Sequence, residues 1–151
     1  EIARPPILAV ASPDFIARSG QPGCPADLLK LPLLHEASYD QWDRWFIQHD
    51  VDGCPPHTGP KFWHNHLTLA AARRGQGIAL ANALLAIDDL QRGSLVALGA
   101  WEPVYLGSYQ LAARRNRWNE PTITAFRRWL QNAVRAEPWV GLRRQESMRR
   151  G

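Results

Sequence analysis

The side chains best suited to chemistry are one cysteine and three histidines in the middle of the chain. They are Cys54, His57, His64 and His66. Thiolate and imidazole are the usual ligands of zinc, and a Cys-x2-His pair followed by His-x-His could supply four of them. Residues two apart on a helix point about 200° away from each other, so His64 and His66 reach one ion only if the backbone there is extended. We therefore favour polar groups at the start of a helix over a metal site, and we expect neither a metal nor a cofactor.

The usual patterns of nucleophilic and phosphate chemistry do not occur in the sequence. It has no Gly-x-Ser-x-Gly run. Asp88 and Asp89 are adjacent carboxylates, but neighbours on a helix point about 100° apart, which disfavours a shared proton and favours a solvated surface. Gly75-Gln76-Gly77 follows a helical segment instead of a strand, so it fits a helix end better than a phosphate loop. We predict that the protein is not an enzyme.

Aromatic side chains could also stack on a ligand. Trp42, Trp45 and Phe46 recur three and four residues apart, which is typical of one buried helix face, so we favour a core role for them. Tyr109 lies on a predicted strand, where its hydroxyl could orient a small molecule. For Tyr109 the sequence leaves a ligand contact and a structural role equally open.

The periodicity of the apolar residues indicates strands that alternate with helices. The expected strands are 6–11, 31–35, 61–63, 78–81, 95–98 and 105–114, and the expected helices are 13–20, 24–30, 38–52, 64–74, 84–90 and one that opens at 120. Such alternation is typical of a mostly parallel α/β sheet, whose ligands bind beyond the carboxyl ends of the strands. This rule places a site near Ser12, 64–66, 81–83 and Tyr109.

The composition fits one ordinary soluble domain. The chain has 151 residues, of which 45% are hydrophobic, and no run reaches the ~18 apolar residues needed to cross a bilayer. With no signal peptide visible and only two cysteines, we expect a cytoplasmic protein with reduced thiols. The net charge is +4 and basic residues gather in the last quarter, where a solvated surface explains them as well as contact with phosphate.

Six runs of residues follow one another in an order and spacing that resemble a known family. They are Leu33–His35, Trp42–Phe46, Gly59–Phe62, Leu67–Leu80, Asp89–Val96 and Ala125–Leu130. Together they resemble the effector domain of LysR-type transcriptional regulators, in the branch that contains the glycine-cleavage activator and the β-lactamase-gene activator. The resemblance extends from about residue 7 to residue 134. Its specificity lies in the order and spacing of the runs, because no single run is diagnostic.

The resemblance implies an α/β fold: a Rossmann-like subdomain of a periplasmic-binding-protein-like (type 2) effector domain, truncated at the N-terminus. Residues 7–103 would form the second effector subdomain, and residues 104–134 the return crossover strand and terminal helix of the first. Residues 135–151 would be a flexible tail. The winged helix-turn-helix and the opening strands of the first subdomain would lie outside this chain. Their absence would explain why the last helix has an apolar face with no strand to cover it.

The resemblance also implies a function and a site. The protein would bind a small-molecule effector in an inter-subdomain cleft and thereby control DNA binding and transcription by the full-length protein. It would be a homodimer or tetramer that contacts DNA only through the missing N-terminal domain and has no membrane contact. The effector contacts, carried over residue by residue, are His64, Asn65, His66, Asn82 and Tyr109. Imidazoles at a helix N-terminus would suit an anionic or carboxylated molecule.

Two other functions stay open at this point. A stand-alone solute-binding protein would have the same architecture, and a secretory signal upstream would favour it. A small enzyme could use the histidine cluster, and metal retained after chelation would support that function. A helix-turn-helix upstream would exclude the solute-binding protein and favour the regulator.

Overall fold

The structure is a computed structural model that describes residues 1–53, 55 and 57–136. Its backbone forms two compact units. One consists of residues 6–106, and the other combines residues 1–5 with the residues from 107 onward. Cys54 and most of the tail expected at 135–151 lie outside the described residues. In the part of the chain that is described, no helix is long and apolar enough to cross a membrane.

The unit of residues 6–106 contains a five-stranded sheet in the order β3-β2-β4-β1-β5. The strands are β1 Ile7–Ala11, β2 Leu33–Glu36, β3 Lys61–Phe62, β4 Ile78–Asn82 and β5 Val96–Ala97. β2 pairs in parallel with β3 and β4, whereas β1 pairs antiparallel with both β4 and β5. The sheet is therefore mixed, which corrects the expectation of a mostly parallel one. Apolar periodicity is the same for either strand direction, so it could not reveal that β1 runs against its neighbours.

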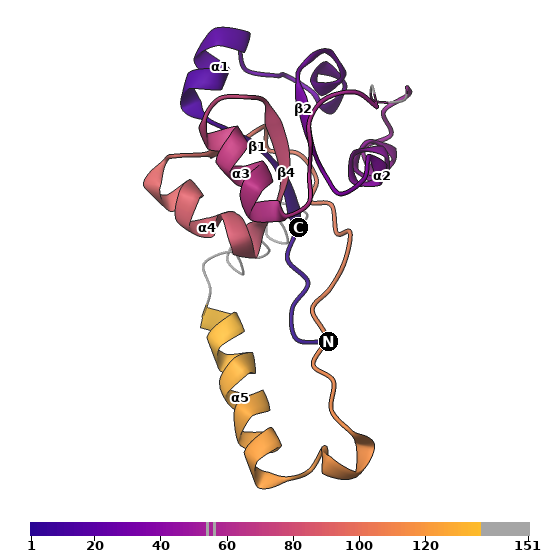
Figure 1. The fold of residues 1–151 in the computed structure, drawn as a ribbon, viewed down its shortest axis with the longest axis vertical. Helices are drawn as coiled ribbons and strands as arrows, with labels where there is room; N and C mark the ends of the chain where they lie inside the picture. The colour runs from indigo at the N-terminus through magenta and orange to yellow at the C-terminus, as the bar shows by residue number, and fades with distance from the viewer. Residues whose placement is uncertain (54, 56, 137–151) are drawn as a thin grey trace, which may run out of the picture. The chain divides into compact units, whose positions relative to one another are not determined.

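Helices cover both faces of this sheet. They are α1 Pro13–Ser19, the 3-10 helix η1 Pro25–Lys30, α2 Asp40–Gln48, α3 Asn65–Arg73 and α4 Ala83–Arg92. Neighbouring strand residues alternate between two apolar clusters: Leu33 packs with Trp42 and Trp45 of α2, while Leu34 packs with Leu69 of α3. The aromatic residues of α2 thus belong to the core, as predicted. Figure 1 shows α3 and α4 together on one side of β4 and α2 away from them.

Side-chain caps set the starts of α1 and of α4, which forms part of the site. The Ser12 hydroxyl accepts a hydrogen bond from the Phe15 backbone N–H at 3.2 Å and caps α1. The Asn82 side-chain oxygen accepts from the Leu84 N–H at 3.0 Å and caps α4. Such caps satisfy backbone donors that the helix itself leaves free. They place both helix N-termini directly after the carboxyl ends of β1 and β4.

The strand expected at 105–114 is wrong. Within that segment the structure has a single isolated bridge, in which the Tyr109 N–H donates to the Ala3 carbonyl at 2.7 Å and the Tyr109 carbonyl accepts from Ile2 at 2.8 Å. The partner segment soon reaches Pro5, which has no N–H to donate, so the ladder cannot continue. The residue types alternate as in a strand, but among the described residues this segment has no strand to pair with.

The second unit also contains the 3-10 helix η2 Arg115–Arg117 and the helix α5 Pro121–Ala136. No described residue of α5 is buried. Phe126 is 48% and Trp129 62% exposed, with ring centroids 5.7 Å apart, while the Arg127 guanidinium lies 4.9 Å from the Trp118 ring centroid. Helix α5 begins where the sequence predicts and, among the described residues of its own unit, has no sheet to cover its apolar face.

Candidate functional site

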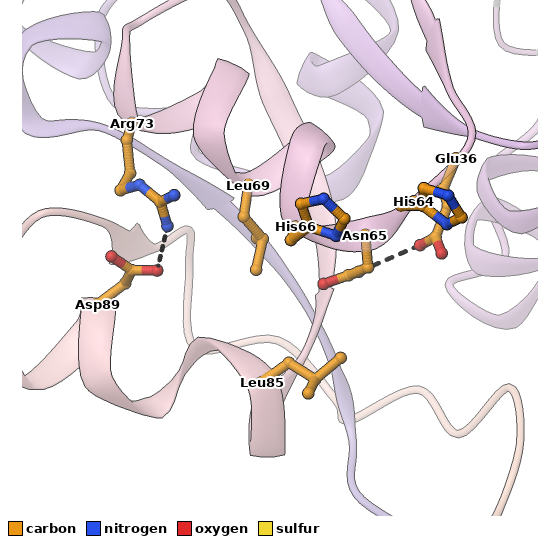
Figure 2. Close-up of a pocket in the computed structure, with 8 residues that line it drawn as sticks. All are labelled: Glu36, His64, Asn65, His66, Leu69, Arg73, Leu85 and Asp89. Atoms are coloured by element: carbon orange, nitrogen blue, oxygen red, sulfur yellow. Dashed lines mark hydrogen bonds and ion pairs between the residues drawn. The ribbon is translucent and has the colours of Figure 1, made fainter.

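A pocket of about 420 Å³ lies between α3 and α4 on one face of the sheet. It is lined by Glu36, His64, Asn65, His66, Leu69, Arg73, Leu85 and Asp89, all from the unit of residues 6–106. Figure 2 shows α3 contributing one wall, α4 the other, and Glu36 reaching in from the carboxyl end of β2. A cavity of this size is in the range that holds small organic ligands.

Two stacked imidazoles form one end of the α3–α4 pocket. The rings of His64 and His66 have centroids 5.4 Å apart and lie 11° from parallel. The sequence requires an extended backbone for these two rings to meet, and the structure has one at His64. His64 is the N-cap of α3, with extended backbone angles of φ −140° and ψ 139°, and only His66 is within the helix. The extended residue brings both rings to the same side.

Asn65 connects this end of the pocket to Glu36. The Asn65 Nδ2 donates to the Glu36 carboxylate oxygen Oε2 at 3.1 Å. The Asn65 Oδ1 is buried and has no hydrogen-bond partner within the described residues, so the bond to Glu36 is what orients the amide. Sequence reasoning missed Glu36 because it ended the strand at His35. The signal was nevertheless present, since Glu36 comes last in β2, and ligands bind where parallel strands end.

An ion pair closes the opposite end of the pocket. The Arg73 Nη1 lies 2.7 Å from Asp89 Oδ2, and the other oxygen of Asp89 accepts from the Ser94 hydroxyl at 2.7 Å. The Asp89 side chain is 15% exposed, whereas that of Asp88 is 72% exposed. The expectation that both carboxylates are simply solvated is therefore wrong for Asp89. Between the two polar ends, Leu69 and Leu85 supply apolar surface.

The structure brings together three of the five predicted effector contacts. His64, Asn65 and His66 line the pocket. Asn82 does not line it, and its side-chain oxygen caps α4 instead. Tyr109 belongs to the other unit, where its backbone bonds to the N-terminal segment and its side chain is 43% exposed.

The three histidines considered as zinc ligands do not form one group. His57 lies beside Asp43, with Nε2 3.0 Å from a carboxylate oxygen, and stacks on Tyr39 at 5.0 Å between ring centroids. His64 and His66 line the pocket, to which His57 does not contribute. Cys54 is outside the described residues. Among the residues that are described, no three His, Cys, Asp or Glu side chains are placed to hold a metal ion.

Comparisons with known proteins identify the family. A family model described as "LysR substrate binding domain" matches residues 1–135. The glycine cleavage system transcriptional activator homolog of Haemophilus influenzae is 34% identical over 131 residues, which cover 87% of this chain and 43% of that protein. The HTH-type transcriptional activator AmpR of Pseudomonas aeruginosa is 33% identical over 133 residues, covering 87% of this chain and 44% of that one. The chain thus spans less than half the length of these relatives, which are transcriptional activators and not enzymes.

Solved structures agree with the sequence relatives. The effector domain of the transcriptional regulator AmpR of Pseudomonas aeruginosa matches with a TM-score of 0.72 and 29% identity, covering 95% of this chain and 66% of that one. The AmpR effector binding domain from Citrobacter freundii matches with a TM-score of 0.69 and 27% identity, covering 90% and 66%. The resemblance expected from the six sequence runs is confirmed. The chain belongs to the LysR substrate-binding-domain family, and its mixed α/β sheet is that of the LysR effector-binding domains.

Proposed function

We propose that this chain is the effector-sensing region of a LysR-type transcriptional regulator and that its α3–α4 pocket binds a carboxylated small molecule. The observation that carries the proposal is the pocket end formed by His64, Asn65 and His66. The first backbone N–H groups of α3 and the partial positive charge of a helix N-terminus favour an anion there. The two imidazoles add ring N–H donors on the same side of the helix start.

In the full-length regulator, binding of the effector would favour one arrangement of the effector domain over another. A ligand shifts such an equilibrium only by its difference in affinity for the two states. Transmitted through a homodimer or tetramer, the shift would change how the N-terminal domains meet DNA. The family resemblance also implies an inter-subdomain cleft in a cytoplasmic protein, for which we propose Asn82 and Tyr109 as contacts outside the α3–α4 pocket.

A panel of small carboxylic acids and their primary amides tests the pocket. Titration of the purified chain by calorimetry is expected to detect binding of carboxylates and much weaker binding of the matching amides. His64→Ala and His66→Ala should each weaken carboxylate binding by about tenfold, the loss of one charge-assisted hydrogen bond. His57→Ala is the matched control, because that imidazole lies outside the pocket. Amides that bind as tightly as their acids would refute the proposal.

The alternative is a stand-alone solute-binding protein of the same architecture. The relatives named above are transcriptional activators, which favours the regulator. The gene sequence upstream of the Glu1 codon separates the two functions. A reading frame that continues into a helix-turn-helix supports the regulator, and one that begins with a secretory signal supports the solute-binding protein.

A further inference from the structure

The charges that line the α3–α4 pocket favour a carboxylated ligand that also carries a cationic group. The lining contains two carboxylates, from Glu36 and Asp89, and one guanidinium, from Arg73. Arg73 and Asp89 neutralise each other at 2.7 Å. With the imidazoles counted as neutral, the excess negative charge of the pocket is that of Glu36.

Glu36 has no charged partner among the residues that the structure describes. Its carboxylate accepts a hydrogen bond from the Asn65 amide, a neutral donor, and in the described part of the chain it forms no ion pair. A ligand that filled the pocket would remove water from this carboxylate. Taking an unpaired charge out of water is costly, whereas a cationic group on the ligand would offset that cost.

The cationic and the anionic group of the ligand must lie close together. Glu36 is bonded to Asn65, and Asn65 is flanked in sequence by His64 and His66 at the start of α3. The proposed carboxylate site and Glu36 therefore belong to the same end of the pocket, as Figure 2 shows. A carboxylate without a neighbouring cation would place its own charge beside that of Glu36, and like charges at such range repel.

We infer that the pocket recognises a zwitterionic, amino-acid-like head group, with Glu36 binding its ammonium and the His64–His66 end binding its carboxylate. This inference rests on the proposed function and narrows its ligand class. The pocket volume of about 420 Å³ leaves room beyond the head group. Leu69 and Leu85 line that remaining space, so an apolar ligand side chain is expected to lie over them.

Three matched sets of probes test the inference by calorimetry on the purified chain. They are leucine, methionine and phenylalanine, the corresponding 2-hydroxy acids, which keep the carboxylate and lose the cation, and the corresponding primary amides, which lose the carboxylate. At least one free amino acid is expected to bind about tenfold or more tightly than both of its analogues, because each analogue lacks one charge-assisted hydrogen bond.

Variants test whether Glu36 causes the preference for the free amino acid over the 2-hydroxy acid. Glu36→Gln should weaken binding of the free amino acid by about tenfold or more and bring its affinity close to that of the 2-hydroxy acid. Glu36→Asp keeps the charge and should retain the preference for the free amino acid. Asp88→Asn is the matched control, since it removes the same charge from an exposed position on α4 outside the pocket. Circular dichroism of each variant establishes that it is folded.

The outcomes separate this inference from the proposed function. If the 2-hydroxy acids bind as tightly as the amino acids, the ligand needs no cation, so the inference is overturned while the carboxylate proposal stands. If no free amino acid in the set binds, the inference is likewise overturned, and the panel of carboxylic acids and amides decides the proposed function. If Glu36→Gln does not fold, the comparison of amino acids with 2-hydroxy acids on the unsubstituted chain still decides.

Discussion

The indole N–H of Trp42 donates a hydrogen bond to the backbone carbonyl of Leu34 at 2.9 Å, inside the core. Trp42 is 1% exposed and comes from α2, whereas Leu34 is in β2, so the bond attaches the helix to the strand that ends at Glu36. A buried carbonyl that loses a donor is destabilising, because it gave up its hydrogen bonds to water on folding. This bond therefore contributes to holding the pocket end of β2 in place.

Trp42→Phe should lower the free energy of unfolding by about 1–3 kcal/mol, because it leaves the Leu34 carbonyl without this donor and opens a small cavity. Urea titration followed by circular dichroism measures the change. Trp63→Phe is the control: Trp63 is 82% exposed, and its substitution should change stability by less than about 0.5 kcal/mol. Equal effects of the two substitutions would contradict this account.

Gly77 precedes β4 at a place where the chain has no room for a side chain. A Cβ atom there would lie 2.6 Å from the Pro32 carbonyl oxygen and 3.2 Å from the Leu34 side chain. Gly77→Ala should therefore destabilise the protein by about 1–3 kcal/mol, as overpacking does. Thermal unfolding tests this against Gly107→Ala, whose added methyl group meets nothing within 4 Å. Unchanged stability of Gly77→Ala would mean that the strand shifts to accept it.

His35 makes stability depend on pH. Its imidazole is 1% exposed, with Nε2 3.0 Å from the Thr58 carbonyl and Nδ1 buried without a hydrogen-bond partner among the described residues. Burial lowers the pKa of His35 below its usual 6.5, an effect that the Thr58 carbonyl opposes. Of the nearby charged groups, His57 and Lys61 also lower the pKa and Asp43 raises it. The folded state thus binds this proton less readily than the unfolded chain, so stability is complete above about pH 6.5 and falls as the pH decreases below it.

Urea unfolding at about pH 8 and about pH 5.5 measures this dependence. His35→Gln should flatten the loss of stability on acidification, whereas His66→Gln, which changes an exposed ring, should keep the slope of the parent chain. His49 is expected to act in the same direction as His35, because burial lowers its pKa too. An unchanged slope in His35→Gln would assign the acid sensitivity to other groups.

Removal of metal is expected to have no effect. The His64–His66 pair offers two ligands, and a structural zinc site needs four. Treatment with EDTA should therefore leave the melting temperature and the circular dichroism spectrum of the purified chain unchanged. A drop in melting temperature that zinc restores would contradict the prediction and direct attention to Cys54 as a further ligand.

The apolar face of α5 should cause the chain to associate with itself. Phe126 and Trp129 are largely exposed, and exposed apolar clusters tend to find a partner. Light scattering after size-exclusion chromatography should show a mass above that of the monomer. The double substitution of Phe126 and Trp129 by Ser should reduce that mass, and the same double substitution at the exposed Arg128 and Asn132 should not. A compact monomer of the parent chain would contradict the prediction.

The sequence predicts most elements of the sheet unit because their signals are local. Ser12 followed by Pro13 marks the start of α1, and the spacing of Trp42, Trp45 and Phe46 marks the buried face of α2. Both features depend only on residues a few positions apart in the sequence. Within the unit of residues 6–106, local patterns therefore sufficed for the helices and for the position, though not the direction, of the strands.

The errors concern contacts between residues far apart in the sequence. β1 pairs with β4, which lies far along the chain, and no pattern within either strand indicates that the two run in opposite directions. Asp89 looked solvated because its partner Arg73 is on another helix. Glu36 was missed because the predicted strand ended one residue too early, and its bond to Asn65 joins residues that are 29 positions apart at one end of the pocket. In each case, tertiary contacts decided the role of a residue whose type was already known.

The order of the strands along the chain has a consequence for folding during synthesis. All five strands lie between Ile7 and Ala97, so the ribosome completes every one of them before it reaches α5 at Pro121. β1 emerges first, yet its neighbours in the sheet are β4 and β5, and it must wait for both. We therefore expect the nascent chain to expose β1 as an unpaired strand until β4 emerges.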